Sequence, residues 1–203
     1  RSRVEFDRIL AQKGLPPGER PLLMAVVQGG GVRDLRRRCA EELLSIGFDA
    51  YGFGGWPLDA QGRLLTDILA YTRELIPPHL VLHALGVGHP AYVAEGARLG
   101  YALYDSALPT RDARHARLYV LRKDAPAGQV SYVYVGDNKH IKSRAPVDPA
   151  CDCLACRRYS LGYLHHLFKI KDAAFQRLAT IHNLRTMVRL TDDLRRIFTA
   201  ERA

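Results

Sequence analysis

Leu22-Leu23-Met24-Ala25-Val26-Val27-Gln28-Gly29-Gly30-Gly31 sets the plan that the first half of this chain repeats. Its six leading apolar residues have the length of a β-strand and suit a strand that helices cover on both faces. Gln28 and the glycines then place a polar side chain and accessible backbone at the end of that strand. A ligand could approach the backbone closely there, although a plain glycine-rich turn explains the glycines equally well.

The same plan of strand, strand end and helix recurs along the chain. An amphipathic helix is expected over 32–46, with Leu35 on its apolar face and Arg36 among the charged residues of the other face. Further helices are expected over 4–12, 62–75 and 91–99, and further strands over 50–53, 80–85 and 101–104. Strands that alternate with helices predict an α/β fold, and right-handed crossovers place the four strand ends on one rim.

Asp105 follows the last of these strands, which is expected to be buried, and it is the centre of the candidate site. Pro109 is expected to stop regular structure, so that the residues after it, with Arg111 and Arg114, form a loop. In a barrel of alternating strands and helices, catalytic residues lie at such strand tips. A carboxylate in this place also fits a helix N-cap or a surface turn.

Two other features of the rim favour structural roles. Gly86-Val87-Gly88 lacks the third glycine of a dinucleotide fingerprint, so a backbone that lies close to a substrate is favoured over nucleotide binding. His83 and His89 have no partners at metal-ligand spacing, and we expect them to be core or rim histidines.

The composition is that of a basic chain with one substantial core. Of its 203 residues 47% are hydrophobic, and 30 Lys and Arg against 21 Asp and Glu give a formal charge of +9. A polyanionic partner such as nucleic acid and a merely basic protein are both open interpretations. No apolar run of roughly 18 residues and no signal peptide are found, so a cytoplasmic protein is expected. Because residue 1 is not methionine, we expect the natural product to begin earlier.

The character of the sequence changes after Arg117. Residues 118–121 and 130–135 alternate aromatic and β-branched side chains around a Pro/Gly-containing turn, which predicts a β-hairpin. A basic stretch over 139–144 follows, and both a solvated loop and a phosphate contact fit it. Helices are expected over 157–178 and 183–200.

Cys151-x-Cys153-x-x-Cys156 places three thiols within six residues. In a reducing compartment this crowding favours a tetrahedral metal site over disulfides. Cys39 is far away in sequence and is expected to be a packed side chain. His182 is preferred as the fourth ligand because 180–183 breaks the two helical patterns there, while His165 and His166 compete for the role. Zinc held by three sulfurs and one nitrogen is a closed structural site.

Short motifs occur in a fixed order from about residue 25 to residue 198. They are Val27-Gln28-Gly29-Gly30, Asp34-Leu35-Arg36, Phe48-Asp49-Ala50-Tyr51, Gly54-Gly55, Gly86-Val87-Gly88, Asp105, Leu108-Pro109-Thr110-Arg111, Arg114, Asp148-Pro149, Cys151-Asp152-Cys153, Cys156, Tyr159, Tyr163-Leu164-His165-His166-Leu167 and Leu178-Ala179-Thr180-Ile181-His182-Asn183-Leu184. In number and order they resemble the C-terminal half of the tRNA-guanine transglycosylases, a family of queuine and archaeosine tRNA-ribosyltransferases.

That resemblance implies a (β/α)8 barrel of the TIM type, to which residues 1–116 contribute the C-terminal half. It implies that residues 117–203 add the hairpin, a zinc-binding subdomain and the closing helices. The implied activity is that of a pentosyltransferase in queuosine biosynthesis, which exchanges guanine in tRNA for a 7-deazaguanine base. The base would be exchanged through a covalent ribosyl intermediate on Asp105.

The resemblance also assigns residues and partners. The residues implied to bind substrate are Gln28, Gly54, Gly55, Trp56, Leu85, Arg111 and Arg114. The residues implied to bind structural Zn²⁺ are Cys151, Cys153, Cys156 and His182. The implied partners are tRNA, a 7-deazaguanine base, and a second copy or a complementing polypeptide, with no membrane.

The chain departs from the family pattern in the base pocket. Trp56-Pro57 stands where Leu-Ser is usual, Ala60 where glutamate is expected, and Tyr104-Asp105-Ser106 where Phe-Asp-Cys is usual. DNA in place of tRNA therefore stays an alternative substrate, and a non-catalytic RNA-binding subunit is a further alternative. Only four strand-helix units are counted, so we expect the remaining strands to come from further sequence, another chain or a cleaved precursor.

Overall fold

The computed structural model of this chain describes residues 1–16, 18–122 and 124–200, with side chains to residue 198. Two compact units make up the fold. We call Arg1–Val87 with Gly96–Asp105 the sheet unit, and Gly88–Glu95 with Ser106–Ala203 the cysteine unit. The predicted division at residue 116 stays a prediction.

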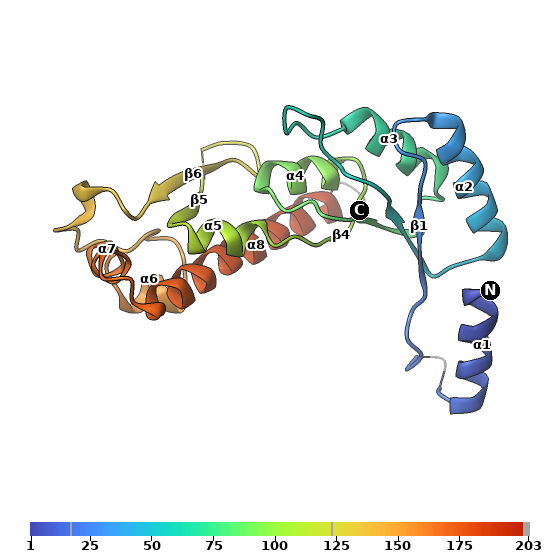
Figure 1. The fold of residues 1–203 in the computed structure, drawn as a ribbon, viewed down its shortest axis with the longest axis horizontal. Coiled ribbons are helices and arrows are strands. Elements are labelled where there is room, and N and C mark those ends of the chain that lie inside the picture. Colours follow the sequence, from blue (N-terminus) through green and yellow to red (C-terminus); the bar gives the residue numbers. More distant parts are fainter. Residues whose placement is uncertain (17, 123, 201–203) are drawn as a thin grey trace. The chain divides into compact units, whose positions relative to one another are not determined.

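The sheet unit is built on four parallel strands in the order β1-β2-β3-β4 (Figure 1). They are β1 (Met24–Val27), β2 (Ala50–Phe53), β3 (Val81–Ala84) and β4 (Leu103–Tyr104). Because all four are parallel and follow in chain order, their carboxyl ends lie along one edge of the sheet. The predicted α/β class with a parallel sheet is confirmed.

Helices alternate with these strands as expected. They are α1 (Ser2–Lys13), α2 (Arg33–Ile46), α3 (Thr66–Leu75) and α4 (Pro90–Arg98). Helix α2 packs against both β1 and α3, and it buries Ala40, while α3 buries Leu69. The start of α3 is four residues later than expected because Leu58 and Leu64 pair in a small antiparallel turn before it.

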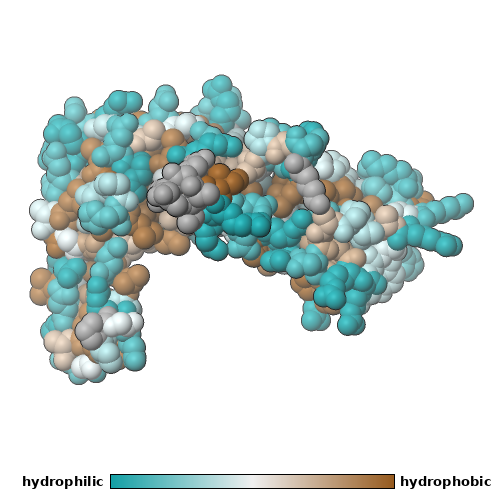
Figure 2. Space-filling view, turned by 180° about the vertical axis from the view of Figure 1, so that it is seen from behind, coloured by the Kyte–Doolittle hydropathy of each residue, from teal (hydrophilic) through white to brown (hydrophobic). Residues whose placement is uncertain are grey.

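One face of the sheet exposes apolar side chains. In the sheet register Met24 lies opposite Ala50, which lies opposite Val81. Leu103 lies opposite His83, two residues after Val81. Because alternate residues of a strand point to the same side, Met24, Val81 and Leu103 lie on one face. These three apolar side chains are exposed, whereas Val27 and Leu82 on the other face are fully buried. Apolar surface is visible over the sheet unit on the left side of Figure 2.

Two expectations about the last strand and the first covering helix were wrong. The strand over 101–104 is neither as long nor as buried as expected: β4 has two residues, and Leu103 is exposed. Arg36 is buried rather than solvent-facing, and Leu35 is exposed instead. The reason is local, because backbone carbonyls at the ends of β1 and β2 accept hydrogen bonds from Arg36.

Besides the first residues of α4, the described part of the cysteine unit contains a hairpin, a 3₁₀ turn and four α-helices. They are α5 (Leu108–Arg114), β5 (Arg117–Leu121), β6 (Val130–Tyr134), a 3₁₀ turn η1 (Asn138–His140), α6 (Leu154–Arg158), α7 (Leu161–Lys169) and α8 (Ala173–Ala200). The predicted hairpin is confirmed as the antiparallel pair β5-β6. Helices α5, α6 and α7 and strand β5 all pack against the long helix α8.

Three predictions about helix ends in this unit were wrong. Pro109 does not stop regular structure but lies in the first turn of α5, where a missing N–H costs nothing. The helix expected over 157–178 is divided, because Ser160 caps α7 and Lys171 has a left-handed φ of 58° before α8 begins. The expected break at 180–183 does not exist, since those residues lie inside α8.

Within the described residues, no helix is long and apolar enough to cross a membrane.

Candidate functional site

The ends of β1 and β2 meet closely through their backbones. The Gly54 N–H donates to the Val27 carbonyl at 2.9 Å, and a Cβ on Gly54 would lie 2.7 Å from that backbone oxygen. Only glycine therefore fits at position 54. Gln28 is exposed, and its backbone N–H is engaged by the Cys39 sulfur at 3.3 Å, which leaves its side-chain amide at the rim.

Gly55, Trp56 and Leu85 complete this part of the rim. Gly55 has a left-handed φ of 99°, which glycine adopts without strain. The Trp56 side chain after it is 71% exposed, which is unusual for so large an aromatic group. Leu85 packs over the position where a Cβ would stand on Gly52.

Asp105 lies at the carboxyl end of β4, as the sequence predicts. Its Oδ1 accepts a hydrogen bond from the Gly86 N–H at 3.1 Å and lies 2.9 Å from Nε2 of His83. The His83 contact has the distance of an ion pair but not the angle of a hydrogen bond. The Asp105 side chain is 59% exposed, so one oxygen is oriented by backbone while the carboxylate stays accessible.

Two rim residues were missed from the sequence as contributors to a site. His83, which we expected to be a core or rim histidine, stands beside Asp105 because β3 and β4 are neighbours. Their adjacency could have been found from strand order alone. The helical periodicity around Arg36 gave no sign that this side chain is buried, and only its place in the family-like motif Asp34-Leu35-Arg36 singled it out.

Arg111 and Arg114 belong to the cysteine unit, where both are exposed on α5. A spacing of three residues places them on one side of that helix. They could therefore contact phosphate groups together. The predicted arginine loop is thus a helix face.

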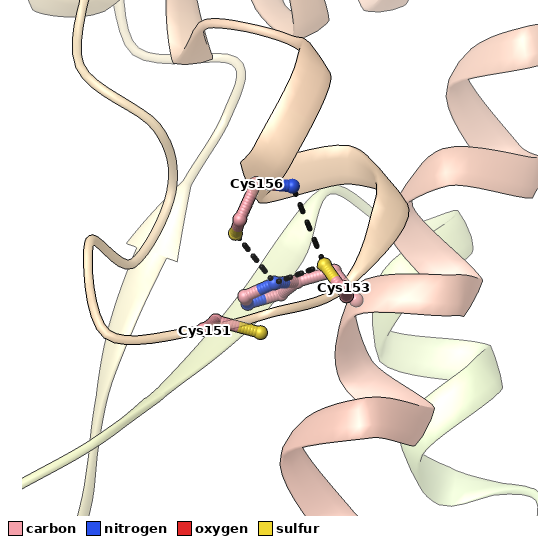
Figure 3. Close-up of side chains that lie close together, drawn as sticks. Cys151, Cys153 and Cys156 are labelled. Carbon is pink, nitrogen blue, oxygen red and sulfur yellow. Dashed lines mark hydrogen bonds between the residues drawn. The ribbon is translucent and has the colours of Figure 1, made fainter.

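The cysteine cluster consists of Cys151, Cys153, Cys156 and His182. Their ligand atoms all lie within 4.8 Å of one another. Nδ1 of His182 is 3.3 Å from the Cys156 sulfur and 3.6 Å from the Cys153 sulfur. In Figure 3 the sulfurs of the three cysteines converge on one imidazole. Tetrahedral zinc with Zn–S bonds of about 2.3 Å separates its ligand atoms by roughly 3.8 Å. These four groups therefore fit such a metal ion.

The surroundings of His182 fix which nitrogen faces the sulfurs. Its Nε2 lies 2.8 Å from the Tyr119 carbonyl and donates its proton there, so Nδ1 is the nitrogen that faces the cluster. This is the arrangement of a metal-bound histidine with an outer hydrogen-bond acceptor. Arg189 and Arg185 hold the cysteine loop through Asp148 and Asp152, at 2.8 Å and 2.7 Å.

Without an ion the cluster is electrostatically crowded. Hydrogen bonds from Cys153 and Cys156 lower the pKa of the Cys151 thiol, while Cys151 and Cys153 raise that of Cys156. Burial disfavours the charged form of His182, but the cysteines and the Tyr119 carbonyl raise its pKa to about 9. A divalent cation would replace these shared protons and neutralise the thiolates.

The competing ligands are accounted for elsewhere. His165 is buried, and its Nδ1 lies 2.7 Å from the Val135 carbonyl. His166 is exposed on α7. Among the described residues, Cys39 is not part of the cysteine cluster.

Comparison with known proteins gives one consistent family. A family profile described as "Queuine tRNA-ribosyltransferase" matches residues 2–202. A protein of that name from Mannheimia succiniciproducens is 35% identical over all of this chain and 49% of its own length. One from Aliivibrio salmonicida is 37% identical over all of this chain and 50% of its length. One from Caldanaerobacter subterraneus subsp. tengcongensis is 35% identical over 91% of this chain and 47% of its length. The chain thus spans about half the length of the curated relatives it matches.

Proposed function

Because the chain belongs to the queuine tRNA-ribosyltransferase family, we propose that it carries the nucleophile-bearing part of a base-exchanging transglycosylase. The substrate is a guanosine in tRNA, and the incoming group is a 7-deazaguanine base. The resemblance stated from the sequence motifs is confirmed at the level of the family. The covalent mechanism and the residue roles that follow are proposals.

The accessible carboxylate of Asp105 is the observation that carries this proposal. One Asp105 oxygen attacks C1′ of the ribose, the glycosidic C–N bond breaks, and guanine leaves with the bonding electrons and takes up a proton. The incoming base then attacks C1′, loses a proton and releases the carboxylate. Two displacements retain the configuration at C1′. The Gly86 N–H and His83 orient the attacking carboxylate.

Base recognition falls to the rim beside it. Neighbouring parallel strands lie about 4.8 Å apart, so the end of β1 is roughly 14 Å from the end of β4 along this edge. A purine with its ribose can span much of that distance. The Gln28 amide offers both a donor and acceptors, the Gly54-Gly55 backbone offers an N–H, and Leu85 offers an apolar wall.

Trp56, Arg111 and Arg114 serve the nucleic acid in this proposal. The exposed indole of Trp56 can stack on a base, and aromatic stacking is tolerant of base identity. The two arginines on α5 offer charge-assisted hydrogen bonds to phosphate. The net charge of +9 favours the approach of a polyanion.

The cysteine cluster holds Zn²⁺ in a structural role. Three thiolates and one imidazole fill the four positions of tetrahedral zinc, so no position is left for a substrate. Bound zinc supplies cross-linking of the cysteine loop to α8. The chemistry of base exchange is therefore assigned to the rim alone.

In this proposal, further strands complete the sheet that carries the rim. One face of the sheet exposes Met24, Val81 and Leu103, and β1 and β4 are the edge strands of the described sheet. In a closed (β/α)8 barrel, four further strands would pair with these edges and help to cover that face. We assign those strands to the half of the relatives that this chain does not span, supplied by a longer polypeptide or a second chain. The same partner would supply the proton-transfer groups.

Incorporation of labelled guanine into tRNA tests the proposal. The zinc-loaded chain, assembled with the first half of the Mannheimia succiniciproducens relative, is compared with its Asp105→Asn variant. We expect a loss of at least about a thousandfold in the variant, because the amide is not a nucleophile. Asp67→Asn, at an exposed helix position, is the matched control and should retain activity.

Three outcomes of this assay would each contradict a different part of the proposal. Incorporation that survives in the Asp105→Asn variant would remove the nucleophile assignment. Labelling of duplex DNA but not of tRNA would replace the substrate while keeping the chemistry. Tight tRNA binding without any incorporation by the assembled protein would favour the RNA-binding subunit.

A further inference from the structure

Arg36 is a buried arginine that pairs with no acidic side chain among the described residues. It is 1% exposed, and desolvation lowers the pKa of its guanidinium. A buried charge is costly unless it is fully hydrogen-bonded, so its partners explain its position. All of those partners belong to the end of the sheet at which Asp105 also lies.

The guanidinium joins three backbone segments. Nη1 donates to the Val27 carbonyl at 3.1 Å, Nε to the Gly30 carbonyl at 2.7 Å, and Nη2 to the Gly54 carbonyl at 2.9 Å. Its central carbon Cζ lies over the Phe53 ring, 4.2 Å from the centroid. The end of β1, the glycine loop after it and the end of β2 are therefore tied to one planar group.

The hydrogen bond from Arg36 to the Gly54 carbonyl orients the peptide between Gly54 and Gly55 at the rim. The Gly54 carbonyl and the Gly55 N–H belong to one planar trans peptide, in which they point in opposite directions. Holding the carbonyl on Arg36 directs the Gly55 N–H away from the guanidinium. With the left-handed φ of 99° at Gly55, this peptide is set in one orientation.

The glycine loop is fitted to Arg36 in the same way. A Cβ on Gly29 would lie 2.6 Å from the Arg36 backbone nitrogen, and Gly29 has a φ of 137°. Gln28 is thus held between the Val27 and Gly30 carbonyls, both of which Arg36 binds. Lysine could not reproduce this, because an ammonium lacks the planar fork of five donors.

We propose that Arg36 is a positioning residue for base binding, which orients the Gly55 N–H and the Gln28 side chain towards the purine. The inference rests on the proposed function only in naming the ligand as a purine base. Arg36 acts through the backbone and touches neither the base nor the ribose.

Guanine titrations of the assembled protein with Arg36→Lys and Arg36→Met test this. We expect KM for guanine to rise about tenfold in both variants, with kcat at saturating guanine and KM for tRNA changed less than about threefold. Arg38→Met, at an exposed position of the same helix, is the matched control. Calorimetric titration with guanine measures the same weakening in the absence of turnover.

A merely structural role predicts a different pattern. Loss of folded protein would lower kcat in proportion to the active fraction and leave KM for guanine unchanged, and that result overturns the inference. Unchanged guanine affinity in folded, zinc-loaded variants also overturns it. Wild-type protein that neither binds nor incorporates guanine removes the proposed function and this inference together. Normal guanine binding without incorporation, weakened by Arg36→Lys, removes the enzyme proposal alone.

Discussion

The cysteine cluster and the strand-end rim are both made of polar groups gathered from separate segments, but one is closed and the other is open. His182 is fully buried, Cys151 and Cys153 are 6% and 5% exposed, and a backbone carbonyl fixes the imidazole. At the rim, the Asp105 side chain is 59% exposed and Trp56 is 71% exposed. A closed set of donors suits a permanent ion, whereas an open set suits a ligand that arrives and leaves.

The same contrast holds for what supports each site. The cysteine cluster stands on a continuous core that includes Leu118, Leu164 and Ala179, all fully buried. The rim stands on a sheet with one buried face and one face that exposes Met24 and Val81. The cluster is therefore supported within its own unit, whereas the sheet that carries the rim leaves apolar side chains of one face exposed.

Removal of the metal should have the largest effect and should separate the two regions. Structural zinc contributes on the order of 10 kcal/mol to such sites, so chelation or Cys153→Ser should unfold the cysteine unit. Hydrogen exchange should show lost protection along α8, while the amides of β2 keep theirs. Cys39→Ser is the control, because that sulfur accepts from the Gln28 N–H and, among the described residues, lies outside the cysteine cluster. Unchanged protection of α8 in metal-free Cys153→Ser protein would show that the core suffices.

Asn183 tests whether the closed region depends on more than its metal. The buried amide accepts from the Tyr119 N–H and donates to the Pro109 and Arg117 carbonyls, each at 3.0 Å. Asn183→Ala removes three hydrogen bonds to backbone groups, those of Tyr119 and Pro109 being buried, so we expect a loss of about 3 kcal/mol in the free energy of unfolding of zinc-loaded protein. Urea unfolding measures it, and Asn138→Ala at an exposed position should change little. A loss as small as that of the control would mean that zinc and the apolar core dominate.

The regular elements of both regions could be predicted because their signals are local. The apolar runs of β1 and β3 and the aromatic alternation of β5 and β6 report burial directly in the sequence. The spacing of the three cysteines likewise reports a shared loop. Such signals do not depend on residues far away in the chain.

What could not be predicted depends on distant partners. The burial of Arg36 follows from the Gly54 carbonyl, which lies 18 residues away. The sequence favours His182 through an expected helix break, yet this residue meets the cysteines from inside α8 because Tyr119, 63 residues away, fixes its ring. The loop expected after Pro109 is instead the start of α5, because proline fits the first turn of a helix as readily as a loop.

Asp49 gives a smaller expected effect and lies in the sheet unit, which carries the rim. Its carboxylate pairs with Arg20 and accepts from the Leu23 N–H at 2.8 Å, which ties the approach to β1 to the start of β2. These bonds lower the pKa of Asp49 from 3.8 to about 2. Because the folded-state pKa is the lower one, the stabilisation is complete above about pH 4 and is lost as the pH falls towards 2.

Asp49→Asn should therefore lower the stability at pH 7 by about 1 kcal/mol, since the pair is partly solvent-screened. The difference from wild type should shrink between pH 4 and pH 2 in urea unfolding at each pH. Asp67→Asn, at an exposed position, is the matched control for the loss of one carboxylate. A constant difference down to pH 2 would show that the lost contacts are not those of the charged carboxylate.

Ala116 gives the smallest expected effect and tests how well the closed region is optimised. It is buried between α5 and β5 with a left-handed φ of 62°, and its carbonyl accepts from the Val135 N–H at 2.9 Å. A side chain in that conformation costs about 1 kcal/mol or more. Ala116→Gly removes the strain but also a buried methyl group and some chain stiffness, so a net gain of about 0.5 kcal/mol is expected. Ala113→Gly, in the ordinary helical backbone of α5, should instead lose about 1 kcal/mol. Thermal unfolding of zinc-loaded protein should shift in opposite directions for the two variants; shifts of the same sign would mean that packing around residue 116 outweighs its backbone strain.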